Sequence, residues 1–143
     1  MRIDLTIQRL GEEQGAAALE FAILAPVFIL MAGGILAYGI YFGAAHSLQQ
    51  LAADAARTSI AGLSAGERDR LVKDYLDANA GGYVLIDPQA LSYKLGGRPG
   101  DADEYVVTLS YDASSLPIWN LYPPLPLPSR TIRYSSAIRI GGL

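Results

Sequence analysis

The side chains that could support catalysis are few in this chain. Cysteine is absent, and His46 is the one histidine among 143 residues. These counts exclude a disulfide framework and a thiolate or histidine-rich metal site, and a Ser-His-Asp triad would depend on His46 alone. No glycine-rich loop is followed by Lys-Ser or Lys-Thr, so a Walker-type phosphate site and the role of an assembly ATPase are excluded. We expect no catalytic residue, no metal site and no cofactor.

A small acidic cluster is the remaining candidate for a metal site. Asp101, Asp103 and Glu104 follow a segment rich in glycine. Carboxylates are suitable ligands for calcium, but the spacing of an EF-hand loop is absent. We interpret the cluster as a solvated turn.

One carboxylate stands in an unusual place. Glu20 lies directly before a long apolar run, and the next acidic residue is Asp54. A charge at the start of a membrane helix is costly unless it stays at the interface or finds a partner. In the simplest interpretation Glu20 lies in the headgroup layer, near the positive end of the helix dipole.

The apolar run has the length of a membrane span. Residues 21–45 carry no charge, and as a helix they would be roughly 37 Å long, enough to cross a hydrocarbon core of roughly 30 Å. The run is too long for a secretory signal, and the rest of the chain is too small to bury it. The chain is 51% hydrophobic and 17% charged with a net charge of −3, so no basic surface for nucleic acid is expected.

Three residues inside the run predict how the helix is shaped and packed. Pro26 removes a backbone hydrogen bond and predicts a kink. Gly39 and Gly43 have the GxxxG spacing that lets a second membrane helix approach closely, although glycines are also common in such helices without this role.

The residues around Glu20 resemble the leader of type IV pilins and pseudopilins. If the chain is cut after Gly15, Ala16 becomes the N-terminus and Glu20 becomes the fifth residue of an apolar helix. Within that group, residues 15–26 resemble the TadE-like family of tight-adherence (Tad) pilus assembly proteins. Residues 52–57 (AADAAR) and the β-rich end near residues 136–139 are further points of similarity.

The resemblance implies a structural function. It implies a leader-processed minor pilin or pseudopilin, single-pass in the bacterial inner membrane, with a cytoplasmic N-terminus and a periplasmic C-terminal domain, in a pilus used for adhesion. The implied partners are the prepilin peptidase, other pilin-like subunits, the pilus assembly platform and membrane lipid. The leader carries only Arg2 and Arg9 as cations, so this orientation comes mainly from the resemblance.

Processing would also give Glu20 a partner. Removal of residues 1–15 exposes the α-amine of Ala16, which can pair with Glu20 of a neighbouring subunit and set the register between helices. Two other interpretations stay open. In the first, the chain is an uncleaved, membrane-anchored periplasmic binding module. In the second, it is a membrane-tethered enzyme, which the missing catalytic groups disfavour.

The sequence predicts an α+β fold in three parts: a leader (1–15), a transmembrane helix that continues into an amphipathic stalk (16–62), and a periplasmic α+β domain (63–143). Ser64 and Glu67 predict the cap of a short helix that ends at Asn79. Alternating apolar residues predict a small antiparallel sheet, at 84–86, 91–95, 105–111 and 131–140.

The segment between the last two predicted strands holds five prolines in residues 116–128, so we expect an extended loop. Trp119 and Tyr122 lie within it. They form an exposed docking surface, or else Trp119 closes the edge of the small core. Arg57 is interpreted as a solvated charge, or as a residue of a salt bridge or docking contact.

Overall fold

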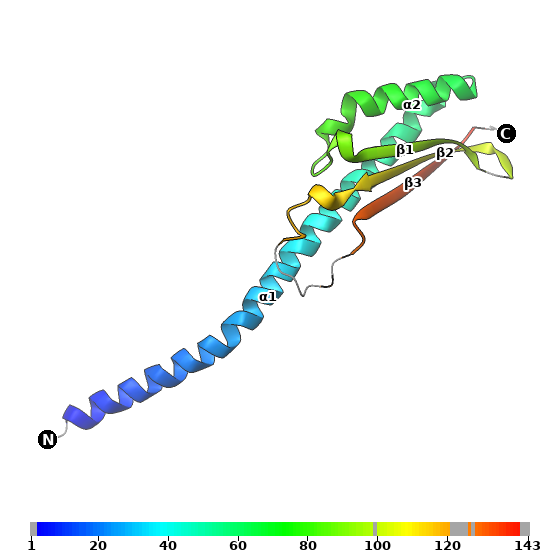
Figure 1. The fold of residues 1–143 in the computed structure, drawn as a ribbon. Helices are drawn as coiled ribbons and strands as arrows, with labels where there is room; N and C mark the ends of the chain where they lie inside the picture. Colours follow the sequence, from blue (N-terminus) through cyan, green and yellow to red (C-terminus); the bar gives the residue numbers. More distant parts are fainter. Residues whose placement is uncertain (1–2, 99, 121–125, 127, 141–143) are drawn as a thin grey trace. The chain divides into compact units, whose positions relative to one another are not determined.

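The computed structural model describes residues 3–98, 100–120, 126 and 128–140, and it has the predicted α+β architecture (Figure 1). Its elements follow one another along the chain as a long helix, a second helix and three strands, with short 3-10 turns between them. These are α1 (Ile3–Thr58), η1 (Ser59–Ala61), α2 (Ala65–Asn79), η2 (Ala80–Gly82), η3 (Pro88–Ala90), β1 (Leu91–Arg98), β2 (Asp101–Asp112), η4 (Ala113–Ser115) and β3 (Thr131–Arg139).

The chain divides into two compact units, Met1–Ala37 and Tyr38–Leu143. Helix α1 contributes to both. This division by contacts does not test the processing and domain boundaries at 15/16 and 62/63, which stay predictions.

The first unit is helical from Ile3 on, and the large apolar side chains that the structure describes there are exposed. They face solvent on every side of the helix, as Phe21, Val27, Ile29 and Leu30 do. Within the described residues, one helical segment, Gly15–Ala61, is long and apolar enough to span a membrane, and little of its most apolar part is buried. The lack of burial distinguishes it from the core helix of a soluble protein.

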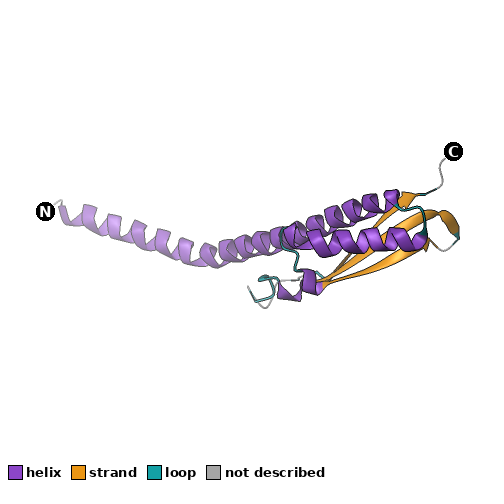
Figure 2. Ribbon diagram, turned by 90° about the horizontal axis from the view of Figure 1, so that it is seen from above, coloured by secondary structure: helices purple, strands orange, loops and turns teal. Residues whose placement is uncertain are grey.

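The core of the second unit lies between helices and one face of the sheet (Figure 2). The second half of α1 contributes small and branched side chains spaced three or four residues apart; Ala44, Leu48, Leu51, Ala52, Ala55 and Ser59 are all buried. This confirms the predicted apolar face of the stalk. Strand β2 contributes alternate residues to the same core, namely Tyr105, Val107, Leu109 and Tyr111.

The three strands form one antiparallel sheet in the order β1-β2-β3. Leu109 of β2 pairs with Tyr93 of β1 and with Tyr134 of β3, so the apolar alternate positions of all three strands share a face. The other face carries Ser92, Lys94, Thr108, Arg133 and Ser135. The alternation predicted for 105–111 and 131–140 is confirmed, and it follows from the two-residue period of a strand.

Helix α2 begins where the capping pattern predicted. The Ser64 side chain accepts a hydrogen bond from the Glu67 backbone N–H at 3.2 Å, and the Glu67 carboxylate accepts one from the Leu63 N–H at 2.9 Å. The helix ends at Asn79, and Val72 and Leu76 are buried. Local sequence therefore determines both ends of this element.

Two local predictions were wrong. Residues 84–86 form a turn rather than a strand, and Leu85 has a φ of 63°, the left-handed region that a strand does not use. Only a few residues separate Gly82 from Pro88, too few for a paired strand. The acidic cluster was interpreted as a turn, but Asp101, Asp103 and Glu104 lie in β2, because the hairpin reverses earlier, at Gly100 with a φ of 92°.

Candidate functional site

The predicted cleavage site lies inside a helix. Gly15 and Ala16 are both exposed residues of α1, and a Cβ added to Gly15 would meet nothing within 4 Å. The predicted carboxylate, Glu20, lies just over one turn further along and is also exposed. Among the residues whose side chains the structure describes, Glu20 takes part in neither of the two ion pairs present.

The three predicted helix-packing residues have different surroundings. Pro26 is exposed within α1, and it leaves the carbonyl of Ala22 without its usual N–H donor. Gly39 has open space around it, whereas a Cβ at Gly43 would lie 3.2 Å from Cδ1 of Leu85 in the same chain. The space at Gly43 is thus used by an intramolecular contact, and Gly39 retains the open surface.

The AADAAR segment is joined to the rest of its unit by a tyrosine cluster, which the sequence did not reveal. The Asp54 carboxylate accepts a hydrogen bond from the Tyr83 hydroxyl at 2.8 Å and pairs with Arg57 Nη1 at 3.0 Å. The hydroxyls of Tyr83 and Tyr75 lie 2.9 Å apart. Arg57 is thus in a salt bridge, although its side chain is 72% exposed. The spacing of Asp54 and Arg57 is the signal that could have indicated this pair.

The environment of these tyrosines favours the protonated hydroxyl. Burial raises the pKa of Tyr83, and its hydrogen bonds to Tyr75 and Asp54 raise it further. A second tyrosine behaves in the same way. Burial raises the pKa of Tyr105, whose hydroxyl donates to Asp69 of α2 at 2.6 Å. These hydroxyls therefore connect elements rather than supply a reactive group.

Trp119 closes one end of the core. Its indole N–H donates to the Ala113 carbonyl at 2.6 Å, and the Arg130 guanidinium lies 5.1 Å from the ring centroid. The neighbouring Ile118 is fully buried. The ring itself is half-buried, so it contributes to the core edge and to the surface. Tyr122 lies outside the described residues.

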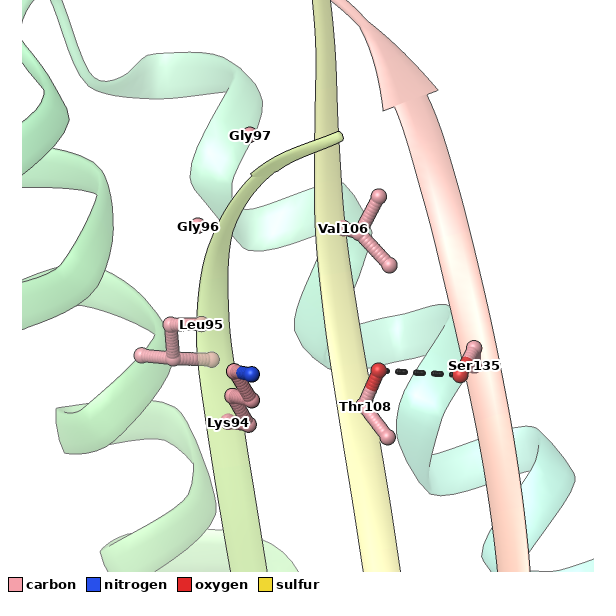
Figure 3. Close-up of a pocket in the computed structure, with 7 residues that line it drawn as sticks. All are labelled: Lys94, Leu95, Gly96, Gly97, Val106, Thr108 and Ser135. Atoms are coloured by element: carbon pink, nitrogen blue, oxygen red, sulfur yellow. Dashed lines mark hydrogen bonds between the residues drawn. The ribbon is translucent and has the colours of Figure 1, made fainter. Parts of the chain in front are cut away.

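The surface hollows carry little chemistry. A shallow hollow of about 480 Å³ on the outer face of the sheet is bordered by Lys94, Val106, Thr108 and Ser135, with the Thr108 and Ser135 hydroxyls 2.9 Å apart (Figure 3). His46 is exposed and lies 3.2 Å from the Gln50 side chain. In the described residues there is no cluster of three metal-ligating side chains.

Taken together, these elements define a class of protein. One long apolar N-terminal helix with the properties of a single-pass membrane anchor continues into the core of a small α+β unit. Residues 15–57 match the model of the family described as TadE-like protein, which confirms the resemblance inferred from residues 15–26 and 52–57. The match indicates a Tad pilus-associated protein. Neither a curated protein nor a solved structure matches the chain significantly.

Proposed function

We propose that this protein is a minor pilin or pseudopilin that functions in the assembly of a Tad-type pilus, through contacts and without chemistry of its own. In this proposal a prepilin peptidase cuts between Gly15 and Ala16. The helix then bundles with other pilin-like helices in the inner membrane, and the unit Tyr38–Leu143 faces the periplasm and contacts the assembly platform.

The position of the family match carries the proposal. The match begins at Gly15, the residue after which the leader would be removed, and it ends at Arg57, the last residue of the AADAAR segment. The matched stretch therefore contains the two residues of the proposed cut, the apolar helix and the salt bridge of Asp54. The preceding residues are the ones that a mature subunit would lack.

The packing of α1 supports a membrane position for the helix. The large apolar side chains from Leu19 to Leu36 are exposed, whereas Ala44 and Leu48 are buried in the second unit. Residues 16–36 would extend roughly 31 Å at about 1.5 Å per residue, which equals the thickness of a hydrocarbon core of roughly 30 Å. The unburied stretch thus has the length of one span when it is counted from the proposed new N-terminus.

The exposure of Glu20 supports its proposed role. It lies roughly 6 Å along the axis from Ala16, and its side chain is exposed. If a neighbouring subunit is displaced along the helix axis by this distance, its α-amine lies beside the Glu20 carboxylate of the first subunit. Pairing would neutralise two charges that are costly in a membrane.

The test is N-terminal sequencing of the protein purified from membranes, made with and without its cognate prepilin peptidase. A chain that begins at Ala16 only when the peptidase is present supports the proposal. Gly15→Val should abolish this cut, whereas the control Gly11→Val, in the same leader, should leave it intact. An intact N-terminus in both preparations would overturn the proposal and leave an uncleaved, membrane-anchored binding module.

A further inference from the structure

The end of the second unit at which α1 enters exposes an unusual group of side chains. Phe42 is 62% exposed and Val84 is 72% exposed, while Leu85 is 38% exposed. Tyr38, Tyr41 and the half-buried Trp119 complete the group. We call these six residues the collar.

Several contacts show that the collar residues lie at one end of the unit. Leu85 lies against Gly43 of α1, one residue beyond Phe42. The Tyr38 hydroxyl donates to the carbonyl of Pro126, and the Tyr38 and Phe42 rings have centroids 6.0 Å apart. The turn of Val84 and Pro126 therefore both lie beside the same two turns of α1.

The sheet register places Trp119 at the same end. Tyr111 of β2 pairs with Leu91 of β1 and Ile132 of β3, so β1 begins, β2 ends and β3 begins together (Figure 1). The Trp119 indole N–H donates a hydrogen bond to the carbonyl of Ala113, which directly follows β2. The Ala113 N–H in turn donates to the Arg130 carbonyl at 2.7 Å.

The backbone conformation at the collar is strained. Leu85 has a φ of 63°, in the left-handed region that a branched side chain rarely adopts. The turn directs Leu85 onto Gly43 and leaves Val84 facing outwards. A polar residue at position 84 would be more favourable in a turn that faces water. The exposed apolar side chain of Val84 therefore indicates a non-aqueous neighbour.

Chain continuity identifies that neighbour. Tyr38 lies two residues after the end of the apolar stretch 16–36, whose length equals that of one hydrocarbon core. Aromatic side chains that carry a polar atom favour the membrane–water interface. Tyr38, Tyr41 and Trp119 are side chains of this type. Arg130, stacked on Trp119, supplies a cation at the level of the lipid phosphates.

We propose that the collar is a lipid-binding surface, through which the second unit rests on the headgroup–acyl boundary of the membrane that α1 spans. Val84, Leu85 and Phe42 enter the edge of the acyl region, and the tyrosines and Trp119 lie among the headgroups. This inference rests on the membrane position in the proposed function. It adds that the second unit contacts the surface of the bilayer instead of being surrounded by water.

The single tryptophan makes the proposal directly testable. The full chain is reconstituted in vesicles of phosphatidylcholine and phosphatidylglycerol that carry a nitroxide quencher on the headgroup or bromine deep in the acyl chains. The headgroup quencher should reduce Trp119 emission strongly, and the deep quencher should reduce it weakly. In a Trp119→Phe background, a Val84→Trp reporter should respond to the headgroup quencher in the same way.

Two further reporters separate the collar from the anchor. In the same background, Leu63→Trp places a reporter after α1, at a residue that is 91% exposed, and it should be insensitive to both lipids. Phe28→Trp reports on the span and should be quenched by the deep bromine.

If the Phe28→Trp reporter is quenched while Trp119 and the Val84→Trp reporter are not, the proposed lipid contact of the collar is overturned and the proposed membrane span is supported. Absence of quenching at Phe28 would overturn both. A Trp119 that is shielded from aqueous iodide and yet insensitive to both lipids would show that protein covers this end, which also overturns the proposal.

Discussion

At the scale of single residues, Glu20 is the side chain on which the proposed assembly depends. It is exposed on α1, and among the residues whose side chains the structure describes it belongs to no ion pair. In the proposed function, the cost of a charge beside an apolar stretch is offset by a partner that arrives with assembly.

Glu20→Gln should therefore be cut after Gly15 like the wild-type chain but should fail to enter a complex with other pilin-like subunits. The amide keeps the size of the side chain and loses the attraction to an α-amine. Crosslinking in membranes followed by N-terminal sequencing measures both steps. Glu13→Gln, in the leader, is the matched control, and a Glu20→Gln protein that assembles normally would contradict the pairing.

The Tyr83 hydroxyl makes the second unit sensitive to alkaline pH. Its pKa is raised in the folded chain, chiefly by burial, from a value near 10 in the unfolded chain. Above pH 10 the unfolded chain releases this proton while the folded chain retains it. The stabilisation is therefore complete below about pH 10 and is lost as the pH rises above that value.

Tyr83→Phe should lower the free energy of unfolding at pH 7 by about 1–2 kcal/mol, because Asp54 loses a donor. It should also flatten the fall in stability above pH 10. Urea unfolding of the full chain in detergent, followed by Trp119 fluorescence, measures both. Tyr93→Phe, at a residue that is 40% exposed, should change neither. An unchanged alkaline slope in Tyr83→Phe would contradict this account.

At the scale of elements, α1 changes its environment along its length. Its first part is exposed and its later part is packed, and Gly39 and Gly43 lie at the transition. The GxxxG spacing predicts one function for both glycines, but the structure separates them, because Leu85 already lies against Gly43.

Gly43→Leu should destabilise the second unit by roughly 1–3 kcal/mol through overpacking against Leu85. Gly39→Leu should leave unfolding unchanged, since its surroundings are open, but it should weaken association between helices in the membrane. Urea unfolding and crosslinking distinguish the two effects. Equal destabilisation by both variants would show that the contact at Gly43 is not specific.

At the scale of the whole molecule, the second half of α1 is part of the core of the second unit. Leu48 and Leu51 of that helix are fully buried with Leu109 and Tyr111 of the sheet. Without this helix, the apolar face of the sheet that it covers would be exposed to water.

A fragment of residues 38–143 should therefore unfold cooperatively, whereas a fragment of residues 63–143, the domain predicted from sequence, should not. Circular dichroism with urea unfolding in mild detergent measures the difference, and the detergent covers the exposed collar. A cooperative transition in the shorter fragment would show that α1 is dispensable for the fold.

The parts of the protein that the sequence determined by itself are those that depend on local pattern. A long uncharged stretch must leave water as a helix, so the apolar span could be predicted. The cap at Ser64, the alternation in β2 and the segment matched to the TadE-like family are likewise contained in a few consecutive residues. The proline-rich segment between β2 and β3 can likewise be recognised from composition alone.

The tertiary structure decided what depends on residues far apart in the chain. The turn at Leu85 is held by Gly43, the Asp54 carboxylate by Tyr83, and the Tyr105 hydroxyl by Asp69. Each of these contacts joins elements whose spacing carries no local signal. The packed end of α1 carries polar residues such as Gln49 and Asp54, which its exposed apolar stretch lacks. Only the fold shows which apolar side chains along the helix are covered by the rest of the chain, because burial is set by what lies opposite a side chain rather than by its type.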